Sequence, residues 1–321
     1  MPHSSVRLRS LGLACLIAAR LMAQSGYRNT DAGRPLRIED ATPIERFGIE
    51  LQFPSFRLER FQPNVQRSQL EPRLSFGILP RTELEMRAPI VYREGNSVAK
   101  SGLAGLGVGM TRNFNDETPS LPAFAANAEV VLPAGAAATS PATIAVRALM
   151  TRTTSFARLH VNAAYGTYNL VSYPPIAGNP TCTTNCGGVI FVPINDGPCE
   201  VEPADAGTLM PPAHWLYSPI QRQTVPTLPD LTQFATVRQG RRLLVGVAGD
   251  HTFPLASTMI AADLYVERFS LSTQPADWSA EFGARHQLGP QVVVDAAVGR
   301  RFTGASQSWY FSLGSSFTVA T

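Results

Sequence analysis

Residues 278–301 read WSAEFGARHQLGPQVVVDAAVGRR, two alternating segments joined by a tight turn at Leu288-Gly289-Pro290. Every second residue of both segments is apolar: Trp278, Ala280, Phe282 and Ala284 in the first, and Val292, Val294, Ala296 and Val298 in the second. Because successive side chains of a strand point to opposite faces, this period of two indicates strands with one apolar and one more polar face.

Alternating segments of this kind recur along the chain, and no comparable helical pattern accompanies them. We expect strands over 44–60, 66–78, 82–93, 103–114, 121–132, 142–151, 156–167, 241–253, 257–269, 276–287, 291–301 and 307–319. Many such strands behind an export signal are typical of a transmembrane barrel. The sequence therefore predicts an all-β fold, an antiparallel transmembrane β-barrel of about twelve strands. A soluble periplasmic β-sandwich is the alternative fold.

The connections between the strands test this prediction. In bacterial barrels, tight periplasmic turns alternate with longer outer loops. Tight turns are expected at 79–81, 152–155, 254–256 and 288–290, and outer loops at 94–102, 133–141, 270–275 and 168–240. The connections 61–65 and 302–306 fall on the outer side and are short, so the alternation is imperfect. The segment 168–240 is one long extracellular loop that folds into the lumen, covers the mouth or projects outward.

The N-terminus has the features of an export signal. Arg7 and Arg9 precede a short apolar run, and a plausible cleavage site follows at Leu21-Met22-Ala23. We expect residues 1–23 to be a signal peptide, residues 24–43 a periplasmic lead-in, and residues 44–321 the barrel. This organisation predicts a location in the outer membrane of a Gram-negative-type cell.

Charge and cysteine content narrow the class further. Three of the 27 basic residues lie in the signal, so the remainder balances its 24 acidic residues, which argues against nucleic-acid binding. Cys182, Cys186 and Cys199 all lie in the long loop, where an oxidising compartment favours one disulfide and a spare thiol. His214 is the only His in that loop. We therefore expect neither a metal site nor a cofactor.

The period of two also assigns the two faces of each strand. Apolar residues such as Phe76, Val247 and Phe282 would meet lipid. The lumen-lining candidates are the charged residues of the opposite face: Glu50, Glu71, Arg73, Glu83, Glu85, Arg87, Glu129, Arg147, Arg158, His160, Asp250, Asp263, Glu267, Glu281, Arg285, Asp295 and Arg301.

Charges in a confined lumen are costly unless they pair, so cross-strand ion pairs are expected. Strand adjacency suggests Arg73 with Glu85, Glu71 with Arg87, and Arg285 with Asp263 or Asp295. Two interpretations remain open, a structural network that plugs a narrow barrel and a charged path for solutes.

A second group of arginines falls at the predicted outer ends of strands: Arg60, Arg67, Arg93, Arg241, Arg242, Arg268 and Arg300. Phosphates of lipopolysaccharide lie at that level and match Arg geometry. The alternative is that long side chains simply extend into water at the interface, which Arg112 and Arg152 at the opposite ends support. The other expected partners are outer-membrane lipid, small solutes and the assembly machinery. Either Phe317 replaces the usual terminal aromatic residue in recognition by that machinery, or assembly is less standard.

No enzymatic activity is expected. The His-x-Ser motif of outer-membrane phospholipase A is absent after each of His160, His214, His251 and His286. His160 and Asp250 on the next strand are the one suggestive acid–base pair, and no nucleophile accompanies them in the sequence.

Four pieces of sequence resemble a known family: Ile38-Glu39-Asp40-Ala41, the turn at 79–85, the strand at 261–268 and the closing hairpin at 284–301. Together they resemble the outer-membrane family named for a putative MetA pathway of phenol degradation. The resemblance implies passage of aromatic or other apolar compounds. We predict a passive channel for small solutes, with apolar or aromatic compounds as the class that the resemblance implies. The alternative is a structural or surface-binding barrel with a salt-bridge-plugged lumen, whose long loop meets a partner.

Overall fold

The computed structural model describes Thr30 and residues 34–61, 65–95, 98–172, 236–272, 275–303 and 307–320. The expected signal peptide, residues 173–235 of the long loop and the candidate disulfide residues Cys182, Cys186 and Cys199 lie outside these ranges.

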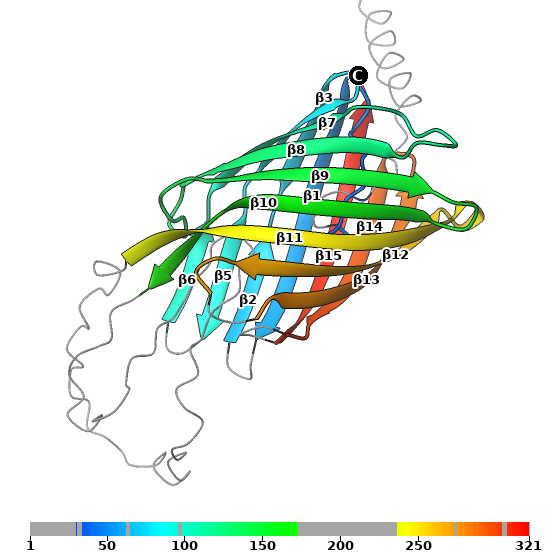
Figure 1. Cartoon of the computed structure of the whole chain (residues 1–321). Coiled ribbons are helices and arrows are strands. Elements are labelled where there is room, and N and C mark those ends of the chain that lie inside the picture. The colour runs from blue at the N-terminus through cyan, green and yellow to red at the C-terminus, as the bar shows by residue number, and fades with distance from the viewer. Residues whose placement is uncertain are drawn as a thin grey trace, which may run out of the picture.

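One antiparallel sheet closes on itself to form a barrel (Figure 1). Its paired segments are β1 (Gly48–Phe61), β2 (Val65–Leu70), β3 (Arg73–Leu79), β4 (Thr82–Arg87), β5 (Ile90–Gly95), β6 (Val98–Leu103), β7 (Leu106–Asn113), β8 (Ala123–Leu132), β9 (Thr143–Thr153), β10 (Arg158–Ser172), β11 (Thr236–Phe253), β12 (Thr258–Phe269), β13 (Asp277–Gly289), β14 (Val292–Arg301) and β15 (Ser308–Ala320). Closure comes from the pairing of β15 with β1, in which Gly48 lies opposite Ala320 and Arg60 lies opposite Trp309.

Three of the barrel strands are broken near their middle. The breaks lie between β2 and β3 at Pro72, between β4 and β5 at Pro89, and between β6 and β7 at Gly105. Proline has no N–H to give to a ladder, and Gly105 has a φ of 146°. Counting each broken pair once, the fifteen segments form twelve strands, and the predicted fold class is confirmed.

The structure corrects two of the expected loops. Residues 94–95 and 98–102 pair as the outer parts of β5 and β6, with Glu94 opposite Ala99. The loop expected at 168–240 is also shorter than predicted, because β10 and β11 remain paired from Tyr168–Gly240 outward to Ser172–Thr236. Among the described residues, the helical structure is a single 3₁₀ turn at Pro254–Ala256, which connects β11 and β12.

The alternation of apolar and polar residues in 278–301 separates the two faces of the barrel wall. In β13 and β14, Glu281, Arg285 and Asp295 are at most 5% exposed, whereas Phe282 is 55% and Val298 44% exposed. Apolar side chains cover the exterior of the other strands as well, for example Ile144, Val247 and Phe311. A continuous apolar exterior around a polar interior indicates a barrel wall that faces lipid.

No helix among the described residues is both long and apolar enough to cross a membrane.

The tight turns at 80–81, 154–157, 254–257 and 290–291 lie at one end of the barrel, together with the C-terminus (Figure 1). By the usual arrangement of bacterial barrels this is the periplasmic end, and the strand ends next to 172 and 236 are on the outer side.

A lumen occupied by the N-terminal segment

Residues 34–44 lie inside the barrel, so the part of the expected lead-in at 34–43 is not periplasmic in this structure. Leu36, Ile38 and Ala41 have no measurable solvent exposure, and Arg34 is 2% exposed. Most contacts of the segment are with β9 to β15, and Asn113 of β7 and Glu83 of β4 bind its last part. We call residues 34–44 the lumen segment.

Side chains of the wall accept hydrogen bonds from backbone N–H groups of the lumen segment. The carboxylate of Asp263 accepts hydrogen bonds from Arg37 N at 3.0 Å and from Ile38 N at 3.2 Å. Arg37 N also donates to Glu281 at 2.9 Å. Since Asp263 lies directly opposite Glu281 in the register, two like charges face each other, and these shared donors reduce their repulsion.

Asn162 and Glu83 fix the next part of the segment. The amide of Asn162 accepts from Glu39 N and donates to Glu39 O, each at 2.9 Å, as a neighbouring strand would. Ile44 N donates to the carboxylate of Glu83 at 2.9 Å. Buried backbone groups need such partners, because an unpaired buried N–H costs about 1–3 kcal/mol. Polar wall residues therefore make a non-strand segment tolerable inside the barrel.

Charged side chains of the segment pair with wall residues of opposite sign. Arg34 forms a two-point ion pair with Asp295, and its Nη1 donates to Ser315 O at 3.1 Å. Arg37 lies 3.5 Å from Glu267, and Glu39 pairs with Arg147. These contacts cover acidic groups of β12–β14 with the donors of the segment.

A buried chain of polar groups surrounds Asp40 and Ala41. Ala41 N donates to the hydroxyl of Thr151 at 2.8 Å, and that oxygen lies 3.0 Å from His160 Nδ1. His160 Nε2 lies 2.6 Å from Asp250, whose carboxylate is 2.9 Å from Arg158. Thr151 is the hydroxyl partner that the sequence did not reveal for His160 and Asp250. Because Thr151 is 4% exposed and already accepts the Ala41 N–H, this chain anchors the segment.

An apolar cluster anchors the centre of the segment. Leu36 and Ile38 pack with Leu244, Met259 and Val293 in the largest buried cluster of the barrel. Glycine at two wall positions leaves room for side chains of the lumen segment. A Cβ at Gly246 would lie 2.5 Å from Ile38 Cδ1, and a Cβ at Gly314 would lie 2.5 Å from Arg34 Nε.

The opposite wall carries its own network of ion pairs. Arg73 lies 3.6 Å from Glu85, and Arg87 lies 3.5 Å from Glu71, the two pairs expected from strand adjacency. Arg73 also contacts Glu71 at 2.5 Å, and Arg87 pairs with Glu129. Glu71 therefore joins two arginines, which links β3, β4 and β8.

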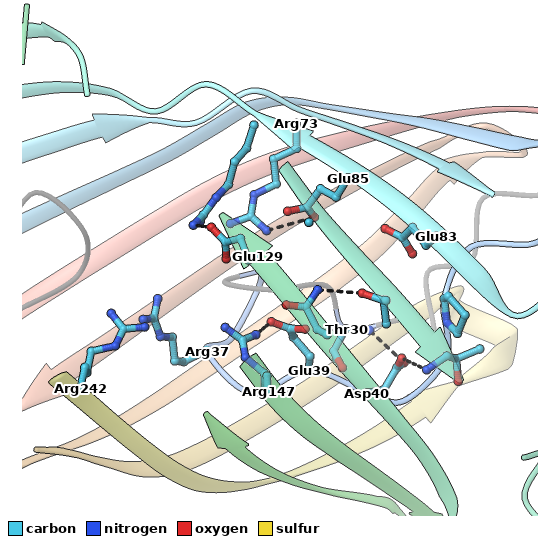
Figure 2. A pocket seen from close by; sticks show the side chains of 16 residues that line it. Thr30, Arg37, Glu39, Asp40, Arg73, Glu83, Glu85, Glu129, Arg147 and Arg242 are labelled. Carbon is cyan, nitrogen blue, oxygen red and sulfur yellow. Dashed lines mark hydrogen bonds and ion pairs between the residues drawn. The ribbon is translucent and has the colours of Figure 1, made fainter. Parts of the chain in front are cut away.

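Between this network and the lumen segment lies a small polar cavity of about 60 Å³ (Figure 2). Arg37, Glu39 and Asp40 of the segment face it from one side, and Arg73 and Glu85 face it from the other. This volume holds a few water molecules. A larger cavity of about 420 Å³ opens at the periplasmic end, lined by residues 42–46 and by turn residues including Arg81 and Glu117.

All of the lumen-lining candidates lie on the inner side of the wall, where they are buried or half-buried. Arg285 is 1% exposed and lies opposite Asp295 in the register, and Arg34 of the lumen segment binds the carboxylate of Asp295. Two further charged residues face the lumen and were not among the candidates: Arg57, which is 3.8 Å from Glu281, and Glu59, which is 3.3 Å from Arg301. Arg57 and Glu59 are two residues apart in β1, and this period of two is the signal that identifies them as inward-facing.

In the part of the chain that the structure describes, no cluster of His, Cys, Asp and Glu suits a metal ion.

A closed twelve-stranded barrel with an apolar exterior and a charged interior defines this protein as an outer-membrane β-barrel. No protein-family model matches the sequence, and no curated protein matches it. The resemblance to the phenol-degradation family is therefore not confirmed.

Three solved structures are similar to this barrel. The COG4313 outer membrane channel from Pseudomonas putida F1 superimposes with a TM-score of 0.54 at 8% identity, over 90% of this chain and 99% of that one. The NanC porin gives a TM-score of 0.46 at 6% identity, over 82% and 98%. The KdgM porin gives 0.39 at 11% identity, over 84% and 98%. The first of these likenesses supports the barrel fold.

Proposed function

We propose that this protein is a passive outer-membrane channel for small solutes, and that the lumen segment closes it in the present state. The observation that carries the proposal is how the lumen is filled. Residues 34–44 bind to the inner wall through side chains, whereas the barrel closes through the strand pairing of β15 with β1. Displacing the segment therefore breaks no strand ladder, and it would join the 60 Å³ and 420 Å³ cavities into a wider path.

The finer solute class rests on the resemblance alone. We propose small apolar or aromatic solutes because the phenol-degradation family implies them. The residual cavity carries both signs of charge, with Arg73 and Arg147 near Glu39 and Glu85. Such a lining is compatible with polar groups on the solute as well.

A second function is favoured by the density of the ion pairs. Ion pairs join the lumen segment to one wall and connect residues within the opposite wall, and the interior cavity has room for only a few water molecules. A permanently plugged barrel would act as a structural or surface-binding protein, whose long loop at 168–240 meets a partner.

We infer a non-enzymatic role in either case. The hydroxyl of Thr151 is engaged by Ala41, so the chain through His160 has no free nucleophile in this state. The proposed partners are outer-membrane lipid, lipopolysaccharide, small solutes and the assembly machinery.

Liposome swelling tests the channel proposal. Mature protein and a variant that lacks residues 24–43 would be refolded into liposomes, with glycine, arabinose and benzoate as probes. The channel proposal predicts faster swelling for the deletion variant, with a cut-off in solute size. Equal rates at the level of protein-free liposomes, in barrels that migrate as folded protein, would support the plugged alternative.

A further inference from the structure

A row of arginine and tryptophan residues marks the outer rim of one half of the barrel. Arg268, Trp278, Arg300, Trp309 and Arg60 each occupy the residue next to the outer end of β12, β13, β14, β15 and β1. All five side chains are exposed, and they alternate from strand to strand around the rim. We call these five residues the rim band.

Strand pairing brings the members of the rim band together. Trp309 lies directly opposite Arg300 on one side and opposite Arg60 on the other. The Arg300 guanidinium lies 5.1 Å from the centre of the Trp309 ring. Trp309 is 57% exposed and Trp278 41% exposed, so both rings face the membrane interface, where amphipathic aromatic side chains are favoured.

The rim band carries positive charge without acidic neighbours on its own face. The acidic residues next to it in the chain are Glu59, Glu267 and Asp277, which point into the barrel and are 3–5% exposed. Within the described ranges, none of Arg60, Arg268 and Arg300 has a carboxylate at ion-pair distance. The outer rim therefore presents three cations to the exterior.

Arginines at the periplasmic end behave differently. Arg81 pairs with Asp116, Arg112 donates to Pro80 O at 2.9 Å, and Arg152 donates to Thr118 O at 2.6 Å. Side chains that merely extended from the membrane into water would have similar surroundings at both ends. Instead, Arg81, Arg112 and Arg152 are satisfied by the protein, and the arginines of the rim band are left for an external acceptor.

Not all of the arginines that the sequence placed at the outer strand ends belong to the rim band. Arg242 and Arg67 face the lumen, where Arg242 lies 3.8 Å from Glu267 and Arg67 donates to Gln69 at 2.9 Å. Arg241 is exposed beside the end of β12, where its N–H donates to Ser270 Oγ. The side chain of Arg93 lies outside the described residues.

We propose that the rim band binds the phosphate groups of lipid A in the outer leaflet. Guanidinium groups match the oxygens of a phosphate in pairs, and the intervening tryptophans stack at the depth of the sugar headgroup. The outer leaflet is the one that holds such phosphates at this end of the barrel. The proposal rests on the outer-membrane orientation and is independent of whether the lumen conducts.

Native mass spectrometry of the refolded mature protein with bisphosphoryl lipid A provides the test. The triple variant Arg60→Gln, Arg268→Gln, Arg300→Gln should bind at least about 100-fold more weakly, since each charge-assisted contact is worth about tenfold or more. The matched control is Arg46→Gln, Arg81→Gln, Arg112→Gln at the periplasmic end, which should bind like the unaltered protein.

Lipid A without phosphates tests the unaltered protein itself, so the result stands even if the triple variant fails to fold. The proposal expects weak binding of this lipid. Equal binding of both lipids, or equal loss in the triple variant and its control, would overturn it. Displacement of lipid A by millimolar inorganic phosphate would identify a free-phosphate site and would also overturn it.

Discussion

Removing the apolar anchor of the lumen segment should release the segment without unfolding the barrel. The change is the double variant Leu36→Ala, Ile38→Ala. Both side chains are fully buried in the largest apolar cluster, and neither belongs to a strand of the wall. Truncating one buried Leu or Ile to Ala costs about 2–5 kcal/mol.

The magnitude follows from the shared site of the two residues. Because Leu36 and Ile38 contact the same cluster, their costs are not simply additive. A conservative total of about 4 kcal/mol lowers the docking equilibrium of the segment nearly a thousandfold, since about 1.4 kcal/mol corresponds to tenfold.

Trypsin reports this equilibrium through the peptide bond after Arg37. The bond lies inside the barrel, between a half-buried Arg37 and a fully buried Ile38, so cleavage requires undocking. When docking is fast relative to cleavage, the rate follows the undocked population. We expect cleavage after Arg37 to accelerate by several hundredfold, measured by mass spectrometry on protein whose gel mobility shows a folded barrel.

The matched control removes equivalent apolar atoms from the exterior. Val247 and Leu264 lie opposite each other and are 51% and 41% exposed, so Val247→Ala, Leu264→Ala leaves the lumen unchanged. This control should be cleaved at the rate of the unaltered protein. Cleavage of the Leu36→Ala, Ile38→Ala variant at that same slow rate would refute the docking argument.

Three further predictions concern the same lumen. Gly246→Leu should accelerate the tryptic cleavage, because its Cβ would lie 2.5 Å from Ile38 Cδ1 of the lumen segment. Gly249→Leu should leave the rate unchanged, because the nearest atom to its Cβ is at 3.6 Å. Equal effects of the two variants would contradict the close fit. Asn162→Ala removes both partners of the Glu39 backbone, at a cost of about 1–3 kcal/mol, and should speed hydrogen exchange of the Glu39 amide about tenfold or more; an unchanged rate would contradict that contact. Undocking should uncover the carboxylates of Asp263, Glu281 and Asp295 and make the open lumen cation-selective. Adding Asp263→Asn, Glu281→Gln and Asp295→Asn to the Leu36→Ala, Ile38→Ala variant should remove this cation preference, measured as the reversal potential. An unchanged reversal potential would contradict the prediction.

The strands and their faces were predictable because they depend on local alternation. Val293, Asp295 and Ala297 are buried and Val298 is exposed, as the period of two requires. The breaks at Pro72 and Pro89 shorten the hydrogen-bonded ladders without changing the number of strands that cross the barrel. Strand number and inward direction were therefore available from the sequence.

The position of the lumen segment was not predictable from its own residues. Leu36, Arg37, Ile38 and Glu39 alternate like a short strand, but their partners lie more than a hundred residues away on several strands. One signal was present in the wall. Asp263 and Glu281 face each other across one hairpin, and two opposed carboxylates require donors, some of which are the N–H groups of Arg37 and Ile38.

The most direct test of a channel closed by its own N-terminal segment is single-channel conductance in a planar bilayer. Mature protein would be compared with the variant that lacks residues 24–43, and deletion of residues 173–235 would serve as a separate comparison for the outer loop. A closed channel predicts rare or small steps for the mature protein and larger, frequent steps for the N-terminal deletion. The absence of steps from both proteins, with folded barrels confirmed by heat-modifiable migration, would contradict the channel and leave the plugged barrel.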